Sequence, residues 1–209
     1  MKSGVDLNNM IYIFVSVILV IITLSLCILP CNAETISVIS EDDYIYVTYE
    51  EFHGNRAYYD TLLLEGYIIC VYVGEEYADA EIARLTQPVE TLHTLVPSSH
   101  ARGTSVPTAE YDVHENPSYH FTCDAKYEML YTNVKFYGCT TYLISGFNAD
   151  YNNKLRIRLF GTTNGTIDFS VPARSSIYKA FATESEQKRF YPAFYPPSNA
   201  YGDISCIAH

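Results

Sequence analysis

The chain has 209 residues, a formal charge of −11, 20 Tyr, 10 Phe and no Trp. A surface this acidic repels phosphate backbones, so the composition excludes a nucleic-acid binder that works through a broad basic patch. Tyr recurs with Thr and Val in short alternating runs, which favours strands over helices.

The first informative element is the apolar run Ile11–Leu29, preceded by Lys2 and followed by the small-residue exit Asn32-Ala33. This pattern predicts a secretory signal peptide over residues 1–33. Because the run approaches the length that spans a bilayer, a retained N-terminal anchor is the alternative. Cleavage would leave residues 34–209 as a single secreted domain that is large enough for one hydrophobic core. We expect that domain to be monomeric and no longer attached to a membrane.

Four cysteines follow the leader: Cys70, Cys123, Cys139 and Cys206. An even number in an oxidising compartment predicts two disulfides, although four cysteines allow three connectivities. We predict a Cys70–Cys206 bridge from the first core strand to the tail, and a local Cys123–Cys139 bridge. CxxC and HxxxH spacings are missing from the sequence, so we expect no metal site and no cofactor.

The first half of the domain predicts strands at Ile36–Ile39, Tyr44–Tyr49 and Tyr67–Val73. Glu75–Gln87 is the only convincing helix, because apolar residues recur on one face, acidic residues fill the first turn and Pro88 ends the segment. Pro97–Pro117 predicts a long loop, which is either a contact surface or a tolerated insertion.

The second half predicts short strands at Tyr119–Thr122, Tyr127–Tyr131, Lys135–Tyr137 and Thr140–Ile144. Leu155–Phe160 and Thr166–Val171 then predict a hairpin around a glycine-containing turn, with Arg156 and Arg158 pointing away from the apolar face. Asn164 begins an N-glycosylation sequon in that turn. The Pro- and Tyr-rich tail from Tyr191 to Tyr201 predicts little regular structure.

Nucleophilic catalysis has little support in these residues. The sequence contains no Gly-x-Ser-x-Gly turn and no glycine-rich phosphate loop, and paired cysteines are not nucleophiles. The six His are scattered, and His120, beside Tyr119 at a strand start, is the one whose neighbours suggest more than a structural role.

The order of several segments resembles the fungal guanyl-specific ribonuclease fold, and more closely the secreted ribonuclease-like effectors of powdery mildews, the RALPH group. The resemblance covers roughly Gly66 to Cys206. Its elements are the Cys-bearing strand Gly66–Val73, the helix core Asp79–Ala83, Tyr127–Leu130, the KLRIRLF run, Asn164-Gly165 and the TIDF run. It implies an α+β fold in which one helix packs on an antiparallel β-sheet, here with extra N-terminal strands and a long loop.

The resemblance also implies site residues. Glu128 falls at the position of the general base, on a central strand, Arg156 at that of the phosphate-binding arginine, and His120 at that of the first histidine. The second histidine, which protonates the leaving oxygen, is replaced by Val171. RNA cleavage needs both a proton acceptor and a proton donor, so the resemblance implies a scaffold without the activity.

We therefore expect a secreted, catalytically inactive ribonuclease-like effector that binds a host molecule, most simply a protein, through a Tyr-rich surface and the Pro97–Pro117 loop. Translocation into the host cell is an open extension of this hypothesis. The alternatives are an extracellular β-sandwich that captures a ligand or acts as a decoy, and an active guanyl-specific ribonuclease.

Overall fold

The computed structural model describes residues 36–86, 99–100, 104–116 and 118–207, which form one mixed α+β unit dominated by strands. The predicted leader and its cleavage point lie outside these residues, as do parts of the predicted loop at 97–117. Among the described residues, no helix combines the length and the apolar character needed to cross a bilayer.

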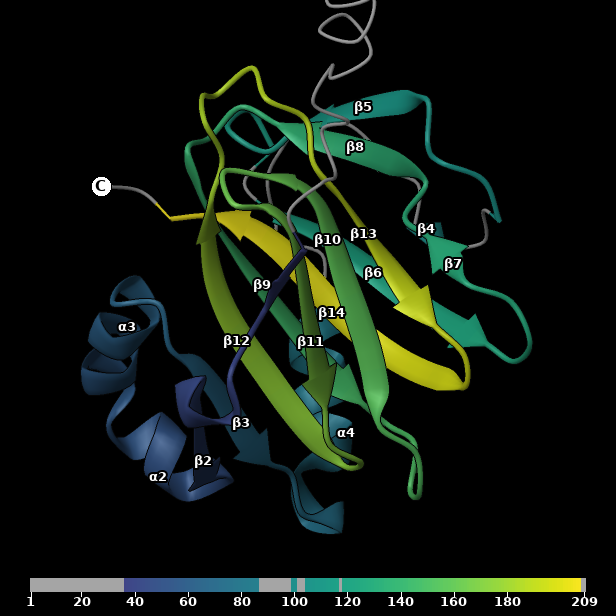
Figure 1. Ribbon diagram of the computed structural model, residues 1–209. Helices are drawn as coiled ribbons and strands as arrows, with labels where there is room; N and C mark the ends of the chain where they lie inside the picture. Colours follow the sequence, from purple (N-terminus) through teal and green to yellow (C-terminus); the bar gives the residue numbers. More distant parts are fainter. Residues whose placement is uncertain (1–35, 87–98, 101–103, 117, 208–209) are drawn as a thin grey trace, which may run out of the picture. The chain divides into compact units, whose positions relative to one another are not determined.

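Two sheets pack against each other, with helices on the far side of the larger one (Figure 1). The large sheet contains, in spatial order, β2 (Tyr44–Thr48), β3 (Ile68–Tyr72), β12 (Ser175–Ala182), β9 (Thr141–Asn148), β14 (Ser198–Cys206), β6 (Ser118–Ala125) and β4 (Ser99–His100). The small sheet contains β1 (Ile36–Val38), β11 (Gly165–Val171), β10 (Leu155–Thr162), β13 (Tyr191–Tyr195) and β7 (Leu130–Tyr131). A separate pair joins β5 (Ala109–Asp112) to β8 (Val134–Tyr137).

The main core lies between the two sheets. Apolar side chains at alternate positions of β10 and β11 meet those of the large sheet. The residues from the small sheet are Leu155, Ile157, Leu159, Ile167, Phe169, Val171 and Phe194, and each is at least 94% buried. The predicted hairpin is thus confirmed, and Val171 packs in the core as its position on the apolar face predicts.

The other face of the large sheet is covered by helices. After the short 3-10 turn η1 (Glu41–Asp43), these are α2 (Tyr49–Gly54), α3 (Arg56–Leu64) and α4 (Glu75–Thr86). Phe52 of α2 and Leu63 of α3 pack on Tyr178 and its neighbours, whereas Leu85 of α4 packs near Phe147. The predicted helix at 75–87 is confirmed as α4.

Several expectations about elements are wrong. The predicted helix α4 is accompanied by two others, because α2 and α3 form from a Tyr-rich stretch whose apolar residues show no clear helical period. The sheets are not purely antiparallel, since β1, β2, β4 and β5 each pair parallel to a neighbour. The Pro-rich tail is not irregular, because it supplies β13 and β14.

The predicted disulfide pairing is also wrong. Cys139 is bonded to Cys206 with a Cα–Cα distance of 6.0 Å, and Cys70 and Cys123 are buried free thiols. Cys70 lies on β3, which β12 and β9 separate from β14. Three strand spacings amount to about 14 Å, beyond the reach of a disulfide. Cys123 is opposite Ala200, far along β14 from Cys206, whereas Cys206 is opposite Tyr142, just after Cys139.

We predict that disulfide mapping will recover a Cys139–Cys206 peptide and that iodoacetamide will label Cys70 and Cys123 only after unfolding. Burial raises the pKa of Cys70 to about 12 and that of Cys123 to about 11, so neither thiolate forms at neutral pH. Because the bridge spans 67 residues, Cys139→Ala should reduce the free energy of unfolding by up to ~4 kcal/mol in the chain-entropy model. A Cys70–Cys206 peptide would contradict this strand order.

Candidate functional site

The outward face of the small sheet follows directly from its buried face. Because Leu155, Ile157 and Leu159 point into the core, Arg156, Arg158 and Phe160 must project to the other side of β10. Asp168 of β11 lies opposite Arg158, and Tyr195 and Tyr191 of β13 lie opposite Arg156 and Phe160. We call this set the Arg–Tyr face: Arg156, Arg158, Phe160, Asp168, Tyr191 and Tyr195.

Both arginines of the Arg–Tyr face bind one carboxylate. Arg156 donates through Nε to Oδ1 of Asp168 at 3.0 Å and through its terminal nitrogen to Oδ2. Arg158 donates to the same Oδ2 at 2.7 Å. The Arg156 side chain is still 49% exposed, whereas that of Asp168 is 9% exposed. The cluster therefore carries one net positive charge, and its most accessible member is a guanidinium.

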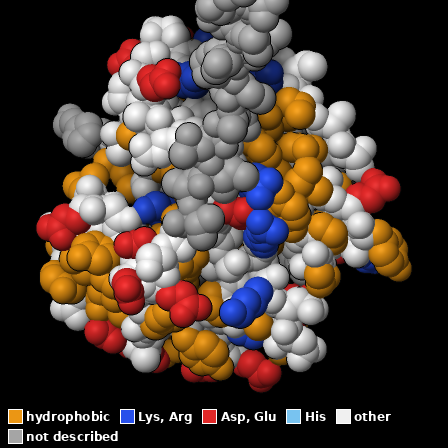
Figure 2. All heavy atoms as spheres, viewed as in Figure 1, with side chains coloured by type: hydrophobic (Ala, Val, Ile, Leu, Met, Phe, Trp, Pro, Cys, Tyr) orange, Lys and Arg blue, Asp and Glu red, His pale blue; other side chains and the backbone are white. Residues whose placement is uncertain are grey.

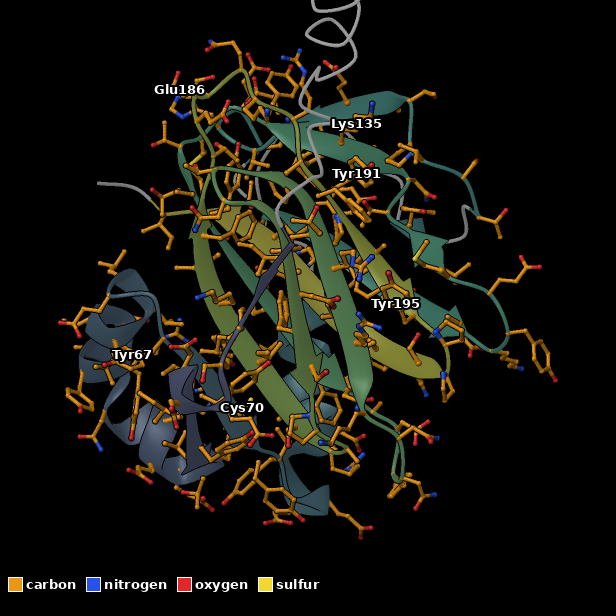
Figure 3. The ribbon with its side chains drawn as sticks, viewed as in Figure 1. Tyr67, Cys70, Lys135, Glu186, Tyr191 and Tyr195 are labelled. Atoms are coloured by element: carbon orange, nitrogen blue, oxygen red, sulfur yellow. A yellow bond between two sulfur atoms is a disulfide. The ribbon has the colours of Figure 1, made fainter. Side chains whose placement is uncertain are left out.

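Aromatic rings hold these guanidinium groups in place. The carbon atoms Cζ of Arg156 and Arg158 lie 4.6 and 5.3 Å from the centroid of the Tyr195 ring, within cation–π range. The rings of Phe160 and Tyr191 stack at 5.1 Å. Figure 3 shows Tyr191 and Tyr195 on β13. Figure 2 shows basic side chains beside a band of hydrophobic ones on the side of the molecule that carries this sheet.

The electrostatics of the face centre on Asp168. Its partial burial alone would raise its pKa, but the hydrogen bonds from Arg156 and Arg158 outweigh this effect and lower the pKa below its usual range. The same contact raises the pKa of Arg156. Asp168 is thus ionised at neutral pH and orders both arginines, which reduces the entropy that a ligand would otherwise have to remove from them.

The structure does not bring the three expected ribonuclease positions together. Arg156 lies on the outward face of the small sheet, and His120 lies on β6 of the large sheet. Glu128 was expected on a central strand. It instead occupies an exposed bend between β6 and β7, because the predicted strand at 127–131 contains only Leu130–Tyr131. No single phosphate could contact the three side chains in this arrangement.

His120 belongs to a polar row beneath α4, in which two side chains are buried and two, including His120, are partly buried. Tyr178, Ser145, Asp203 and His120 are register partners across four neighbouring strands of the large sheet. Ser145 donates its hydroxyl hydrogen to Asp203, and His120 Nδ1 lies 2.6 Å from the carbonyl oxygen of Leu85 in α4. Ser145 therefore donates to an acid and not to a histidine, which is not the geometry of an activated nucleophile. The hydroxyl oxygen of Ser118 lies 3.3 Å from Nε2 of His120.

The charged residues of α4 complete this polar layer. Glu81 is fully buried and accepts hydrogen bonds from Arg84, Ser176 and Tyr178. Burial opposes its ionisation, but these hydrogen bonds and the Arg84 charge lower its pKa overall. Every polar atom named here has a partner within the protein, so the layer serves to dock α4 on the sheet.

Other expected site residues can be placed more briefly. Asn164 is exposed in the turn of the β10–β11 hairpin, where a glycosyltransferase could reach it. The described residues contain no group of three or more His, Cys, Asp or Glu side chains arranged to hold a metal ion.

Sequence reasoning singled out Arg156 but missed the partners that make it a site. The alternation of Arg156 and Arg158 was visible, and so was Asp168 on the facing arm of the hairpin. Tyr191 and Tyr195 could not be added, because their segment was not predicted to form a strand and nothing local indicates that it pairs with β10.

Comparisons with known proteins add no family to this description. No family model matches the chain, and neither a curated protein nor a solved structure matches it.

We predict that Asp168→Asn will reduce the free energy of unfolding at pH 7 by ~1 kcal/mol, because solvent screens part of a charged hydrogen-bond network. The pKa of Asp168 in the folded protein lies below its ordinary value of 3.8, so the stabilisation by Asp168 is present above pH 3.8 and is lost as the pH falls through the folded-state pKa. Urea titrations of both proteins should therefore converge at acidic pH.

A matched control is Glu110→Gln. Glu110 accepts two hydrogen bonds from Arg189 at 2.9 Å, with both side chains more exposed than Asp168. At pH 7, Glu110→Gln should reduce the free energy of unfolding by less than Asp168→Asn does. An Asp168→Asn effect that is constant from pH 7 to pH 2 would contradict the assigned ion pairs.

Proposed function

We propose that the protein is a secreted, non-catalytic binding protein and that the Arg–Tyr face contacts a carboxylate-bearing segment of a partner protein, most simply a protein of the host. The observation that carries this proposal is the ordered pair of arginines that share one carboxylate and lie against the rings of the same sheet. Arg and Tyr dominate the energetics of many protein interfaces.

The chemistry of the face favours a protein partner over a nucleic acid. Its local charge is only +1, in a chain with a formal charge of −11, so it cannot neutralise a run of phosphates. One further carboxylate could share Arg156, and apolar side chains could lie against Tyr191 and Phe160. A short acidic and apolar segment meets both requirements.

Secretion and action on a host remain parts of this proposal that rest on the leader pattern of residues 1–33. The ribonuclease-like ancestry rests on the order of segments alone. The face-to-face packing of two sheets supports the β-sandwich alternative, whereas the helices on the large sheet support the α+β expectation. Arg156 and His120, two of the expected ribonuclease residues, lie on different sheets. Either ancestry is compatible with binding through the Arg–Tyr face.

We predict that a short fluorescein-labelled peptide of glutamate and leucine residues will bind the purified protein, and that Arg156→Ala/Arg158→Ala will weaken binding at least tenfold. A charged hydrogen bond contributes about 1.5–3 kcal/mol, which corresponds to a factor of ten or more. Fluorescence anisotropy measures the affinity.

The control variant is Arg189→Ala. Arg189 has the same chemistry as Arg156, with a paired carboxylate and a tyrosine ring at 4.9 Å, but it lies outside the Arg–Tyr face. It should leave the affinity unchanged, and a matching peptide with lysine in place of glutamate should not bind. Equal binding by the double variant, or arginine-dependent binding of heparin without the peptide, would overturn the proposal.

A separate prediction is that the protein will not hydrolyse a guanylyl dinucleotide, and that Val171→His will not create activity. Val171 is fully buried, so an imidazole there would enter the core between the sheets instead of reaching a phosphate. Turnover that disappears in Glu128→Gln would contradict the hypothesis of a non-catalytic protein and support the ribonuclease alternative.

A further inference from the structure

A hollow of about 500 Å³ opens where the turn of the β10–β11 hairpin meets the end of β12 and the α3–β3 connection. This volume falls within the range of small-molecule sites in proteins. Its walls are mostly apolar: Leu63, Leu64, Ile167, Ala180, Phe181 and Ala182. Thr163 and Asn164 of the turn add polar groups, and the hollow shares no residue with the Arg–Tyr face.

Lys179 also lines this hollow, and its position is unusual for a lysine. It lies in the middle of β12, 8% exposed, between Ile177 and Phe181, which both belong to the core between the sheets. Its Nζ donates to the carbonyl oxygen of Gly66. Gly66 follows the C-terminal end of α3 with a φ of +102°, which directs the chain into β3.

Within the part of the chain that the structure describes, the ammonium group of Lys179 has no neutralising anion beside it. Among the described residues, no carboxylate oxygen lies within 4.0 Å of Nζ, and the Gly66 carbonyl provides one acceptor for three N–H groups. Burial lowers the pKa of Lys179, partly opposed by the more distant charge of Asp43. A buried charge without an ion pair is costly, so an anion that enters the hollow would be stabilised there.

We propose that this hollow binds a small amphipathic carboxylate, with the carboxylate on Lys179 Nζ and the hydrocarbon part against Leu63, Ile167 and Phe181. The ligand supplies a counter-charge that the described residues do not place beside Lys179, and the apolar walls remove its chain from water. A carboxylate could also accept hydrogen bonds from the N–H groups of Lys179 that the Gly66 carbonyl does not engage. The site is independent of the proposed partner surface.

The experiment uses decanoate as the probe, with decan-1-ol as a neutral analogue of the same chain length, and isothermal titration calorimetry on the purified protein. Decanoate should bind at least tenfold more tightly than decan-1-ol, because only decanoate pairs with the ammonium group. Lys179→Met keeps the length and apolar stem of the side chain, so it should remove this preference while leaving the alcohol affinity unchanged. Lys154→Met, at an exposed position outside the hollow, should bind decanoate normally.

Two further measurements separate this role from a purely structural one. Ala182→Phe places a ring at the exposed rim of the hollow and should weaken decanoate and decan-1-ol equally. Lys179→Met should melt at the same temperature as the unmodified protein or higher, since it removes an unneutralised buried charge. Failure of the unmodified protein to bind decanoate, or an unchanged decanoate preference in Lys179→Met, would overturn the proposal.

Discussion

The apolar alternation of β10 is the constraint on which the candidate surface depends. Leu155, Ile157 and Leu159 can enter the core only if the residues between them face outward. A shift of one residue would bury Arg156 and Arg158 between the sheets and expose the leucines. Burial of the apolar residues in the core therefore determines which face of the small sheet carries the arginines, whether or not a partner binds there.

The same logic explains the polar layer under α4. The large sheet is covered by the small sheet on one side and by helices on the other, so most of the side chains that alternate with its core residues are buried or partly buried. Ser145, Asp203 and His120 lie on that second face and find partners on the helix or on each other. Glu81 completes the arrangement from α4. His120 therefore has a structural reason for its position, and no catalytic role is needed to account for it.

The parts of the fold that could be predicted are those whose signal is local. The β10–β11 hairpin alternates with period two, and α4 repeats its apolar residues at helical spacing and ends before a proline. β12 could not be recognised, because both of its faces are buried and its residues, which include Lys179, show neither alternation nor an apolar run. β13 carries a proline and pairs with a strand some 35 residues earlier, a relation that no local pattern encodes.

The prediction of the disulfide pairing was wrong for the same reason. Pairing depends on which strands are neighbours, and the order β9–β14–β6 results from the packing of the whole sheet. The candidate site was half accessible to sequence reasoning: the arginines and Asp168 belong to one hairpin, whereas the tyrosines come from the Pro-rich tail. Local patterns thus placed Arg156 and Arg158 on the outward face of the hairpin but did not indicate that the tyrosines of β13 lie beside them.

Uncompensated positive charge has different consequences at the two proposed sites. On the Arg–Tyr face, water screens the excess charge of Arg156 and Arg158, so the empty face is stable and the charge serves mainly to select a partner. The formal charge of −11 would repel an acidic partner at long range. Moderate salt screens this long-range repulsion, so it should raise the association rate of an acidic partner while the close contacts to Arg156 and Arg158 persist. Lys179 is only 8% exposed, so water screens its charge less, and an anion in the hollow would interact with it more strongly.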